Sequence, residues 1–251
     1  MAEELRDRAI VLGVVDYGES DRIVTLLTRE HGKIGAFARG GRASRRRFAG
    51  ALLPFTLLEV RLVPRRGDLF GLSSCVIEEA FVGLRDSLEA ISLAGYAAEL
   101  CRELCKEREP HPEFFERLRA YLDSLASGVV RAEERLAFEM GAVGEAGLAP
   151  RLDACVRCEE APGSRLAFDP SAGGILCGRC IGERSAGRIP LGEGALALLR
   201  EAQLSEPGDR PEAPGPGALR EACRCTRHYL RHVLGKDLRS LTVLRQLGLE
   251  G

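Results

Sequence analysis

The chain has 251 residues, of which 45% are hydrophobic and 29% charged, an ordinary composition for a soluble globular protein of one or two domains. No apolar run approaches the roughly 18 residues of a membrane span, and residues 1–7 lack the basic-then-apolar form of a signal peptide. We therefore expect a cytoplasmic protein without a membrane partner. The formal net charge of −1, taken alone, argues against a nucleic-acid binder.

The charges are unevenly distributed along the chain. Residues 31–66 hold nine basic and one acidic residue, a local charge of +8, and residues 220–245 hold seven basic and two acidic residues, a local charge of +5. Residues 85–145 hold eight basic and thirteen acidic residues, a local charge of −5. This asymmetry indicates basic surfaces that face a polyanion and an acidic body elsewhere.

The first part of the chain reads as strands and the rest mainly as helices. Runs rich in β-branched and aliphatic residues, bounded by turns, predict five strands over residues 9–17, 22–28, 34–38, 55–63 and 69–80. Apolar residues then recur with helical spacing over residues 84–104, 114–125, 131–146 and 192–204, and two further helices are split at Gly235. Residues 206–217, rich in Pro and Gly, are expected to form a loop.

This pattern predicts an α+β fold with two domains. Five short strands with tight turns in about 80 residues are typical of a small barrel such as the OB-fold. We expect an OB-fold DNA-binding domain at residues 1–80 and an all-helical domain at residues 81–251, which contains an inserted cysteine module at residues 150–190.

Four cysteines form two C-x-x-C pairs, Cys155 with Cys158 and Cys177 with Cys180. The pairs are separated by the 18 residues 159–176, a spacing typical of a tetrahedral four-thiolate zinc site. Because such a site has no open position for substrate, we expect a structural Zn²⁺ that stabilises a small module. A direct role in substrate binding and a redox dithiol pair are the alternatives.

The other cysteines and the histidines carry weaker signals. Nine cysteines without an export signal favour reduced, metal-bound thiols over disulfides. Cys101 and Cys105 could face one ion, but their place near an apolar stripe favours buried thiols, while His228 and His232 suit a basic helix facing an anion. The sequence contains no P-loop, GxGxxG, HExxH or GxSxG motif, so we expect no enzymatic activity.

A basic loop lies between the third and fourth predicted strands. It places five arginines in nine residues, and a turn further along adds two more candidates for the same surface; the seven are Arg39, Arg42, Arg45, Arg46, Arg47, Arg65 and Arg66. A guanidinium group can donate two parallel hydrogen bonds to the oxygens of one phosphate, and the loop glycines allow the backbone to approach the phosphate closely. A merely solvated loop is the alternative. The predicted barrel favours DNA contact, whereas we expect nearby aromatic residues to lie in the core (Phe37, Phe48, Phe55 and Phe70).

The run of residues 16–28, followed by His31-Gly32-Lys33, Ala38-Arg39-Gly40-Gly41-Arg42 and Pro54-Phe55, resembles the N-terminus of the bacterial recombination mediator family RecO. The four-cysteine module and the element at residues 229–235 extend the resemblance over nearly the full chain. It implies an OB-fold, a helical domain around a zinc module, binding and annealing of single- and double-stranded DNA, and no catalysis. It also implies two partners, RecR and the acidic C-terminal tail of single-stranded DNA-binding protein.

By position, the resemblance assigns DNA contact to Lys33, Arg39 and Arg42. Arg227 and Arg231, in the closing helices, are candidates for partner binding. The leading hypothesis is a mediator of DNA repair and recombination that helps to load recombinase onto coated single strands. The alternative is a protein-interaction adaptor with incidental DNA affinity. A zinc-dependent hydrolase is disfavoured because all four candidate ligands are thiols.

Overall fold

The computed structural model describes residues 4–44, 47–48, 50–65, 67–128, 130–182, 187–212 and 215–249. Three predicted DNA-binding residues, Arg45, Arg46 and Arg66, therefore lie outside the described residues. Contacts divide the chain into two compact units, residues 1–129 and 130–251. The division into sequence domains at residues 80 and 81 stays a prediction.

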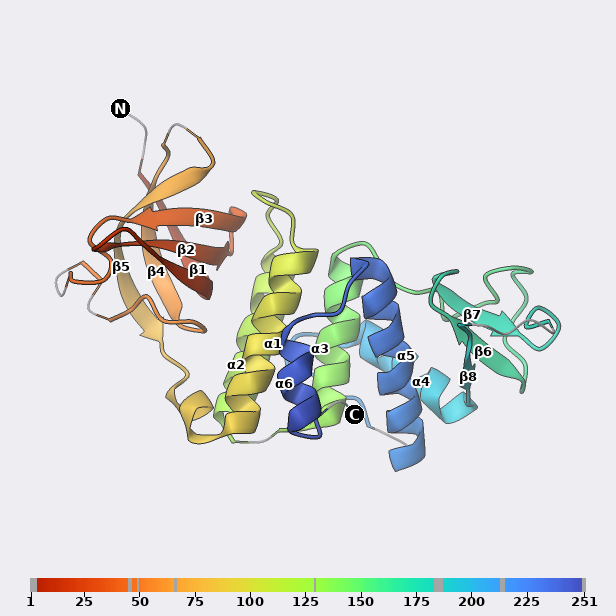
Figure 1. The fold of residues 1–251 in the computed structure, drawn as a ribbon. Helices are drawn as coiled ribbons and strands as arrows, with labels where there is room; N and C mark the ends of the chain where they lie inside the picture. Colours follow the sequence, from red (N-terminus) through yellow and green to blue (C-terminus); the bar gives the residue numbers. More distant parts are fainter. Residues whose placement is uncertain are drawn as a thin grey trace. The chain divides into compact units, whose positions relative to one another are not determined.

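Five strands close into a barrel in the first unit (Figure 1). They are β1 (Leu5–Tyr17), β2 (Asp21–Thr28), β3 (Gly32–Ala38), β4 (Leu57–Val63) and β5 (Leu69–Glu79). Their order is β1-β2-β3-β5-β4, and β4 returns to pair with β1. The β3–β5 pair is parallel and the other four pairs are antiparallel. The barrel confirms the predicted α+β class with an N-terminal OB-fold.

Alternation along the strands separates the barrel core from its outer face. In β3 the even positions, such as Ile34 and Ala36, are buried, whereas Lys33, Gly35 and Phe37 are only partly buried. The connection from β3 to β4 contributes Phe48 and Leu52, each 1% exposed, to the same core. The expectation that Phe48 is a core residue is therefore confirmed, and Phe37 lies on the other side of the strand.

A short 3₁₀ helix, η1 (Val82–Asp86), and two α-helices, α1 (Leu88–Leu104) and α2 (Pro112–Ala126), complete the first unit. The expected helix start at Leu84 is wrong, because Ser87 caps α1. Its Oγ accepts a hydrogen bond from the Ala90 N–H at 3.2 Å, which places the first helical residue at Leu88.

The segment after α1 returns to the barrel and lies against the start of β3. Lys33 forms a parallel bridge with Glu107, and the Arg108 N–H donates to the Lys33 carbonyl at 2.9 Å. Gly32 has a φ of +69°, and a Cβ at this position would overlap the backbone of Glu109. The His-Gly-Lys turn therefore requires glycine for both its conformation and this close approach.

The second unit contains four helices and a small sheet in its described residues. The helices are α3 (Ala132–Glu145), α4 (Glu193–Leu204), α5 (Pro216–Leu234) and α6 (Ser240–Gln246). Helices α3, α4 and α5 pack against one another (Figure 1). Gly235 ends α5 in the left-handed conformation, with a φ of 66°, at the break that the sequence predicts.

The small sheet is formed by β6 (Leu166–Asp169), β7 (Gly174–Cys177) and β8 (Ile189–Leu191), in the order β7-β6-β8. The Asp169 side chain shapes the turn between β6 and β7, because its Oδ1 accepts from the backbone N–H groups of Ser171 and Ala172 at 3.1 and 3.2 Å. This sheet carries the second cysteine pair. None of the helices in the described ranges is long and apolar enough to cross a membrane.

Candidate nucleic-acid interface and metal centre

The four predicted thiol ligands come together at one end of the small sheet. Cys155, Cys158, Cys177 and Cys180 place their Sγ atoms within 4.8 Å of one another. Cys158 Sγ and Cys177 Sγ are 3.6 Å apart, close to the separation of about 3.8 Å that two ligands of a tetrahedral ion have at Zn–S bonds of ~2.3 Å. The fold therefore forms a four-thiolate cluster that could hold a metal ion.

Each cysteine pair lies in a tight turn with its own backbone hydrogen bonds. The Glu159 N–H donates to the Cys155 carbonyl at 2.9 Å, and the Cys180 N–H donates to the Cys177 carbonyl at 2.9 Å. The Val156 N–H also donates to the Ile175 carbonyl of β7 at 2.9 Å. These bonds fix the first turn to the sheet that carries the second turn.

The local environment divides the four thiols into two kinds. Burial alone would raise the pKa of Cys155, but hydrogen bonds from the backbone of Cys177, Cys158 and Arg157 outweigh it and lower the pKa to about 6. The backbone N–H of Cys180 lowers the pKa of Cys177. Burial raises the pKa of Cys158, and a side-chain hydrogen bond with Cys158 raises that of Cys180 to about 12.

The donor set fits a thiophilic divalent cation. Four thiolates in so small a space repel one another, so a central cation is the simplest way to stabilise all four. Sulfur ligands in a tetrahedral arrangement suit zinc better than magnesium or calcium, which prefer oxygen.

Within the second unit, Tyr229 of helix α5 contacts the cysteine module. The Tyr229 ring meets the Phe168 ring of β6 edge-on, with centroids 5.7 Å apart. Its hydroxyl donates to the Leu148 carbonyl at 2.7 Å. From α4, the Arg200 guanidinium donates to the Leu152 carbonyl at 2.7 and 2.9 Å. The ring of Tyr229 thus contacts the module through Phe168, and its hydroxyl is bonded to the segment just before the module.

We expect Tyr229→Phe to destabilise the second unit by about 1–2 kcal/mol, because it leaves the Leu148 carbonyl without this donor. Tyr229→Ala also removes the buried ring and should cost about 3–5 kcal/mol. Urea unfolding followed by circular dichroism measures both changes. Tyr17→Phe is the matched control, because Tyr17 is 56% exposed and should change stability by less than about 0.5 kcal/mol. Equal effects at the two tyrosines would contradict the anchoring role.

The described part of the basic loop lies beside the turn between β1 and β2. Arg39 and Arg42 are exposed. The Arg42 N–H donates to the Ser20 carbonyl at 3.0 Å, and the Gly40 N–H donates to Asp21 Oδ1 at 2.6 Å. Arg47 is exposed as well, and its guanidinium donates to the Arg39 carbonyl at 2.5 Å. The loop is therefore held to the barrel by its backbone, while the side chains of Arg39, Arg42 and Arg47 remain exposed, with Arg42 3.6 Å from the Asp16 carboxylate.

Lys33 has a different environment from these arginines. Its side chain is 13% exposed. The ammonium group donates to the Arg102 carbonyl at 2.5 Å and lies 3.4 Å from a Glu107 carboxylate oxygen. These contacts tie β3 to the C-terminal end of α1, so the structure gives Lys33 internal partners. Its contact with DNA stays a prediction.

Aromatic side chains lie on the outer face of the barrel, next to the arginines. Phe37 is partly buried, and the Arg65 guanidinium carbon lies 4.9 Å from its ring centre. The interpretation of Phe37 as a core residue is wrong, because it occupies an outward position of β3. Sequence reasoning also missed Tyr17, which ends β1 and packs edge-on against Phe37 at 5.8 Å. The alternation along β3 was the signal that could have identified Phe37, whereas β1 has a register shift near Gly13 and its last three residues are all exposed, so its pattern gave no such signal for Tyr17.

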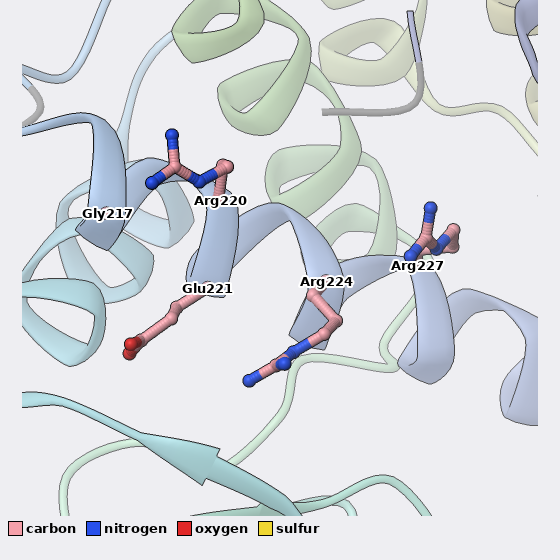
Figure 2. A pocket seen from close by; sticks show the side chains of 5 residues that line it. All are labelled: Gly217, Arg220, Glu221, Arg224 and Arg227. Atoms are coloured by element: carbon pink, nitrogen blue, oxygen red, sulfur yellow. The ribbon is translucent and has the colours of Figure 1, made fainter. Parts of the chain in front are cut away.

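Helix α5 carries a stripe of arginines. Arg220, Arg224, Arg227 and Arg231 recur at intervals of four, three and four residues, which places them along one side of the helix. The first three line a hollow of about 390 Å³ together with Gly217 and Glu221 (Figure 2). Figure 2 shows Glu221 and Arg224 projecting to the same side. They reach the segment around β8, where Glu221 accepts from the Gly192 N–H at 2.9 Å and Arg224 donates to the Pro190 carbonyl at 3.4 Å.

The two arginines predicted to bind a partner follow on the same helix. Arg231 is exposed and lies 3.5 Å from Asp237, and Arg227 is partly buried. Burial lowers the pKa of His228, and the nearby charges of Arg227, Arg224 and Arg231 lower it further. Burial is the larger cause, and the three arginine charges add to it, so this side of α5 concentrates positive charge.

The five remaining cysteines lie outside the cluster. Cys101, Cys105, Cys223 and Cys225 are buried, and Cys75 is partly buried. The expected burial of Cys101 and Cys105 is thereby confirmed. Burial raises the pKa of Cys75 to about 11 and that of Cys225 to about 12. Neither of these two thiols is set up as a nucleophile at neutral pH.

Together, an OB-fold barrel with a basic loop and a helical body with a four-thiolate module define an α+β protein of the OB-fold class. Family models named "Recombination protein O N terminal" and "Recombination protein O C terminal" match residues 1–81 and 85–242. The chain belongs to the RecO family, as its resemblance predicts.

Three curated relatives illustrate the similarity, and each carries the name DNA repair protein RecO. The protein from Anaeromyxobacter sp. (strain K) is 49% identical over 244 residues, which cover 95% of each chain. The protein from Myxococcus xanthus (strain DK1622) is 44% identical over 250 residues, covering 99% of this chain and 100% of the relative. The protein from Pelobacter propionicus is 38% identical over 246 residues, covering 97% of each chain.

Proposed function

We propose that this protein mediates DNA repair and homologous recombination without catalysing a reaction. It binds single- and double-stranded DNA, anneals complementary strands and, together with RecR, helps to load recombinase onto strands coated with single-stranded DNA-binding protein. Membership in a family whose relatives are named DNA repair proteins supports the role in repair. We place the protein in the cytoplasm, where bacterial DNA and a reducing environment coincide.

The observation that carries the DNA-binding proposal is the loop of exposed arginines fixed to the barrel by its backbone. Arg39, Arg42 and Arg47 face solvent around the turn between β1 and β2. When such groups bind phosphates of two complementary strands, they neutralise negative charge on both. This lowers the repulsion between the strands and favours annealing. We assign Arg45, Arg46, Arg65 and Arg66 to the same surface from the sequence, and Lys33 is retained as a predicted contact.

We infer that the ion at Cys155, Cys158, Cys177 and Cys180 is a structural Zn²⁺. The four sulfur donors and their separations support zinc. When bound, the ion supplies a cross-link between the two cysteine turns. With all four positions taken by protein, the site offers no place for substrate, so its role is to stabilise the module that α5 contacts.

We further propose that the arginine stripe of α5 binds the acidic C-terminal tail of single-stranded DNA-binding protein. Arg227 and Arg231 belong to a row of four arginines on one side of α5, together with Arg220 and Arg224. Carboxylate groups of a peptide tail suit guanidinium partners, and such contacts weaken with added salt.

The test of DNA binding uses the purified protein with fluorescently labelled single- and double-stranded oligonucleotides and no other protein. We expect the logarithm of the association constant to fall linearly with the logarithm of the salt concentration. The slope should be near −4 for about six phosphate contacts on a single strand. No binding to either DNA at low salt would favour the adaptor hypothesis, in which the basic surfaces bind acidic proteins.

A further inference from the structure

The outer face of the barrel carries an apolar patch that the phosphate-binding loop does not explain. Tyr17 is 56% exposed at the end of β1. Ile23 of β2 pairs with Phe37 of β3 in the antiparallel ladder, so their side chains lie on the same face. The Tyr17 and Phe37 rings are in edge contact at 5.8 Å. The exposed Tyr17 ring thus extends the partly buried Phe37 and Ile23 into one apolar patch on this face.

This patch has a cavity and a cation stacked on it. Tyr17, Ile23, Phe37, Arg65, Asp68 and Leu69 line a hollow of about 460 Å³, within the size range of small-molecule sites. The Arg65 guanidinium carbon lies 4.9 Å from the Phe37 ring centre, although the Arg65 residue as a whole is exposed. The hollow therefore offers two aromatic rings and a planar cation to a flat ligand.

The lining of the hollow carries one cation, Arg65, and one carboxylate, Asp68. A carboxylate in the lining repels phosphate, but it accepts hydrogen bonds from amino groups such as the N4 amine of cytosine. The loop that we propose for phosphate binding begins close by. Asp16, the neighbour of Tyr17 in β1, lies 3.6 Å from Arg42 and 3.1 Å from Arg22. The phosphates of a DNA strand would thus bind at the arginine loop, and one base of the same strand would bind in the adjacent hollow.

We propose that the hollow between Tyr17, Phe37 and Arg65 binds an unpaired nucleobase by stacking, so that this face of the barrel distinguishes single-stranded from double-stranded DNA. The inference rests on the proposed DNA binding and adds the chemical group that is recognised. In a duplex the bases are paired and stacked, so they cannot enter the hollow without being flipped out. Stacking is tolerant of sequence because every base has a π-face.

The test compares Tyr17→Ala with the unmodified protein on three ligands: a single-stranded oligonucleotide, the same strand with abasic sites, and a duplex. We expect Tyr17→Ala to weaken binding to the intact single strand by about 5- to 150-fold, the range for loss of one stacked base. The duplex affinity and the salt slope should not change, because no phosphate contact is lost. The abasic strand should bind the unmodified protein more weakly and be insensitive to the substitution.

Tyr17→Phe should restore binding to the single strand, because it keeps the ring. Val76→Ala is the matched control, since Val76 is also an exposed apolar residue of the barrel, 65% exposed, and does not line the hollow. Circular dichroism of each variant establishes that it is folded.

Tyrosine emission provides an independent readout. The chain has no tryptophan and four tyrosines. Tyr96, Tyr121 and Tyr229 are 2%, 5% and 6% exposed, whereas Tyr17 is 56% exposed. Single-stranded DNA should therefore quench the emission of Tyr17, after correction for absorption by DNA, and Tyr17→Phe should bind without this quenching.

The outcomes separate this inference from the proposed function. If Tyr17→Ala and the unmodified protein bind single-stranded DNA with the same salt-dependent affinity, base stacking is overturned and the proposed function stands. A parallel loss on single strand and duplex would also overturn it. Failure of the unmodified protein to bind any DNA would overturn both proposals.

Discussion

Removing the metal with a strong chelator should unfold the module at residues 150–190 and leave the barrel folded. Among the described residues, the buried cluster around the thiols contains five, Cys155, Ala167, Leu176, Cys177 and Ile181, and two of these are candidate metal ligands. So small a cluster should not hold the two cysteine turns together without the ion, since structural zinc sites contribute on the order of 10 kcal/mol of apparent binding free energy.

Hydrogen exchange of the purified protein, before and after chelation, measures this effect. We expect amide protection in β6 and β7 to be lost and protection in β1–β5 to be retained. Cys177→Ser should also abolish binding of one metal equivalent. Cys75→Ser is the matched control, because Cys75 is a partly buried cysteine of β5 outside the cluster. Protein prepared without chelators that contains no metal, or unchanged protection after chelation, would contradict a structural metal site.

Replacing Arg45, Arg46 and Arg47 with alanine should reduce the salt dependence of single-strand binding. If each arginine contacts one phosphate, the slope of log affinity against log salt should become less negative by about 2. The affinity at low salt should fall at the same time, because counterion release drives this binding. Fluorescence anisotropy over a salt series measures both quantities.

A matched triple variant keeps the same change in net charge. Arg6, Arg29 and Arg119 lie in the same unit, have side chains 67%, 45% and 37% exposed, and are paired with nearby carboxylates. Their replacement with alanine should leave the slope within error of the unmodified protein. Equal changes in the loop variant and the control variant would remove the loop from the DNA surface and leave only a general charge effect.

Local signals in the sequence were sufficient to predict the barrel and the cysteine cluster. The strands are runs rich in aliphatic or β-branched residues and bounded by turns, and such patterns depend little on distant residues. The two C-x-x-C turns encode their own geometry, so the spacing alone predicted four sulfur atoms in one place. The helix start at Leu84 was wrong because an apolar stripe extends through the 3₁₀ turn and does not reveal that Ser87 caps α1.

The surroundings of individual charged and aromatic residues could not be predicted in this way. The motif that contains Lys33 does not show that its ammonium group lies against the end of α1, because the partner Arg102 is 69 residues away. Phe37 was placed in the core because apolar residues surround it, whereas only the pairing register fixes which face it occupies. The hydrogen bond from Tyr229 to the Leu148 carbonyl, just before the module, likewise joins residues 81 positions apart.

Strand annealing tests the central claim most directly. Two complementary fluorescent oligonucleotides, each coated with single-stranded DNA-binding protein, are mixed with the protein over a salt series. The account predicts faster annealing that weakens as salt is added and that is lost in the Arg45, Arg46 and Arg47 variant. No acceleration by folded, metal-loaded protein would contradict a DNA mediator and support a protein-interaction adaptor instead.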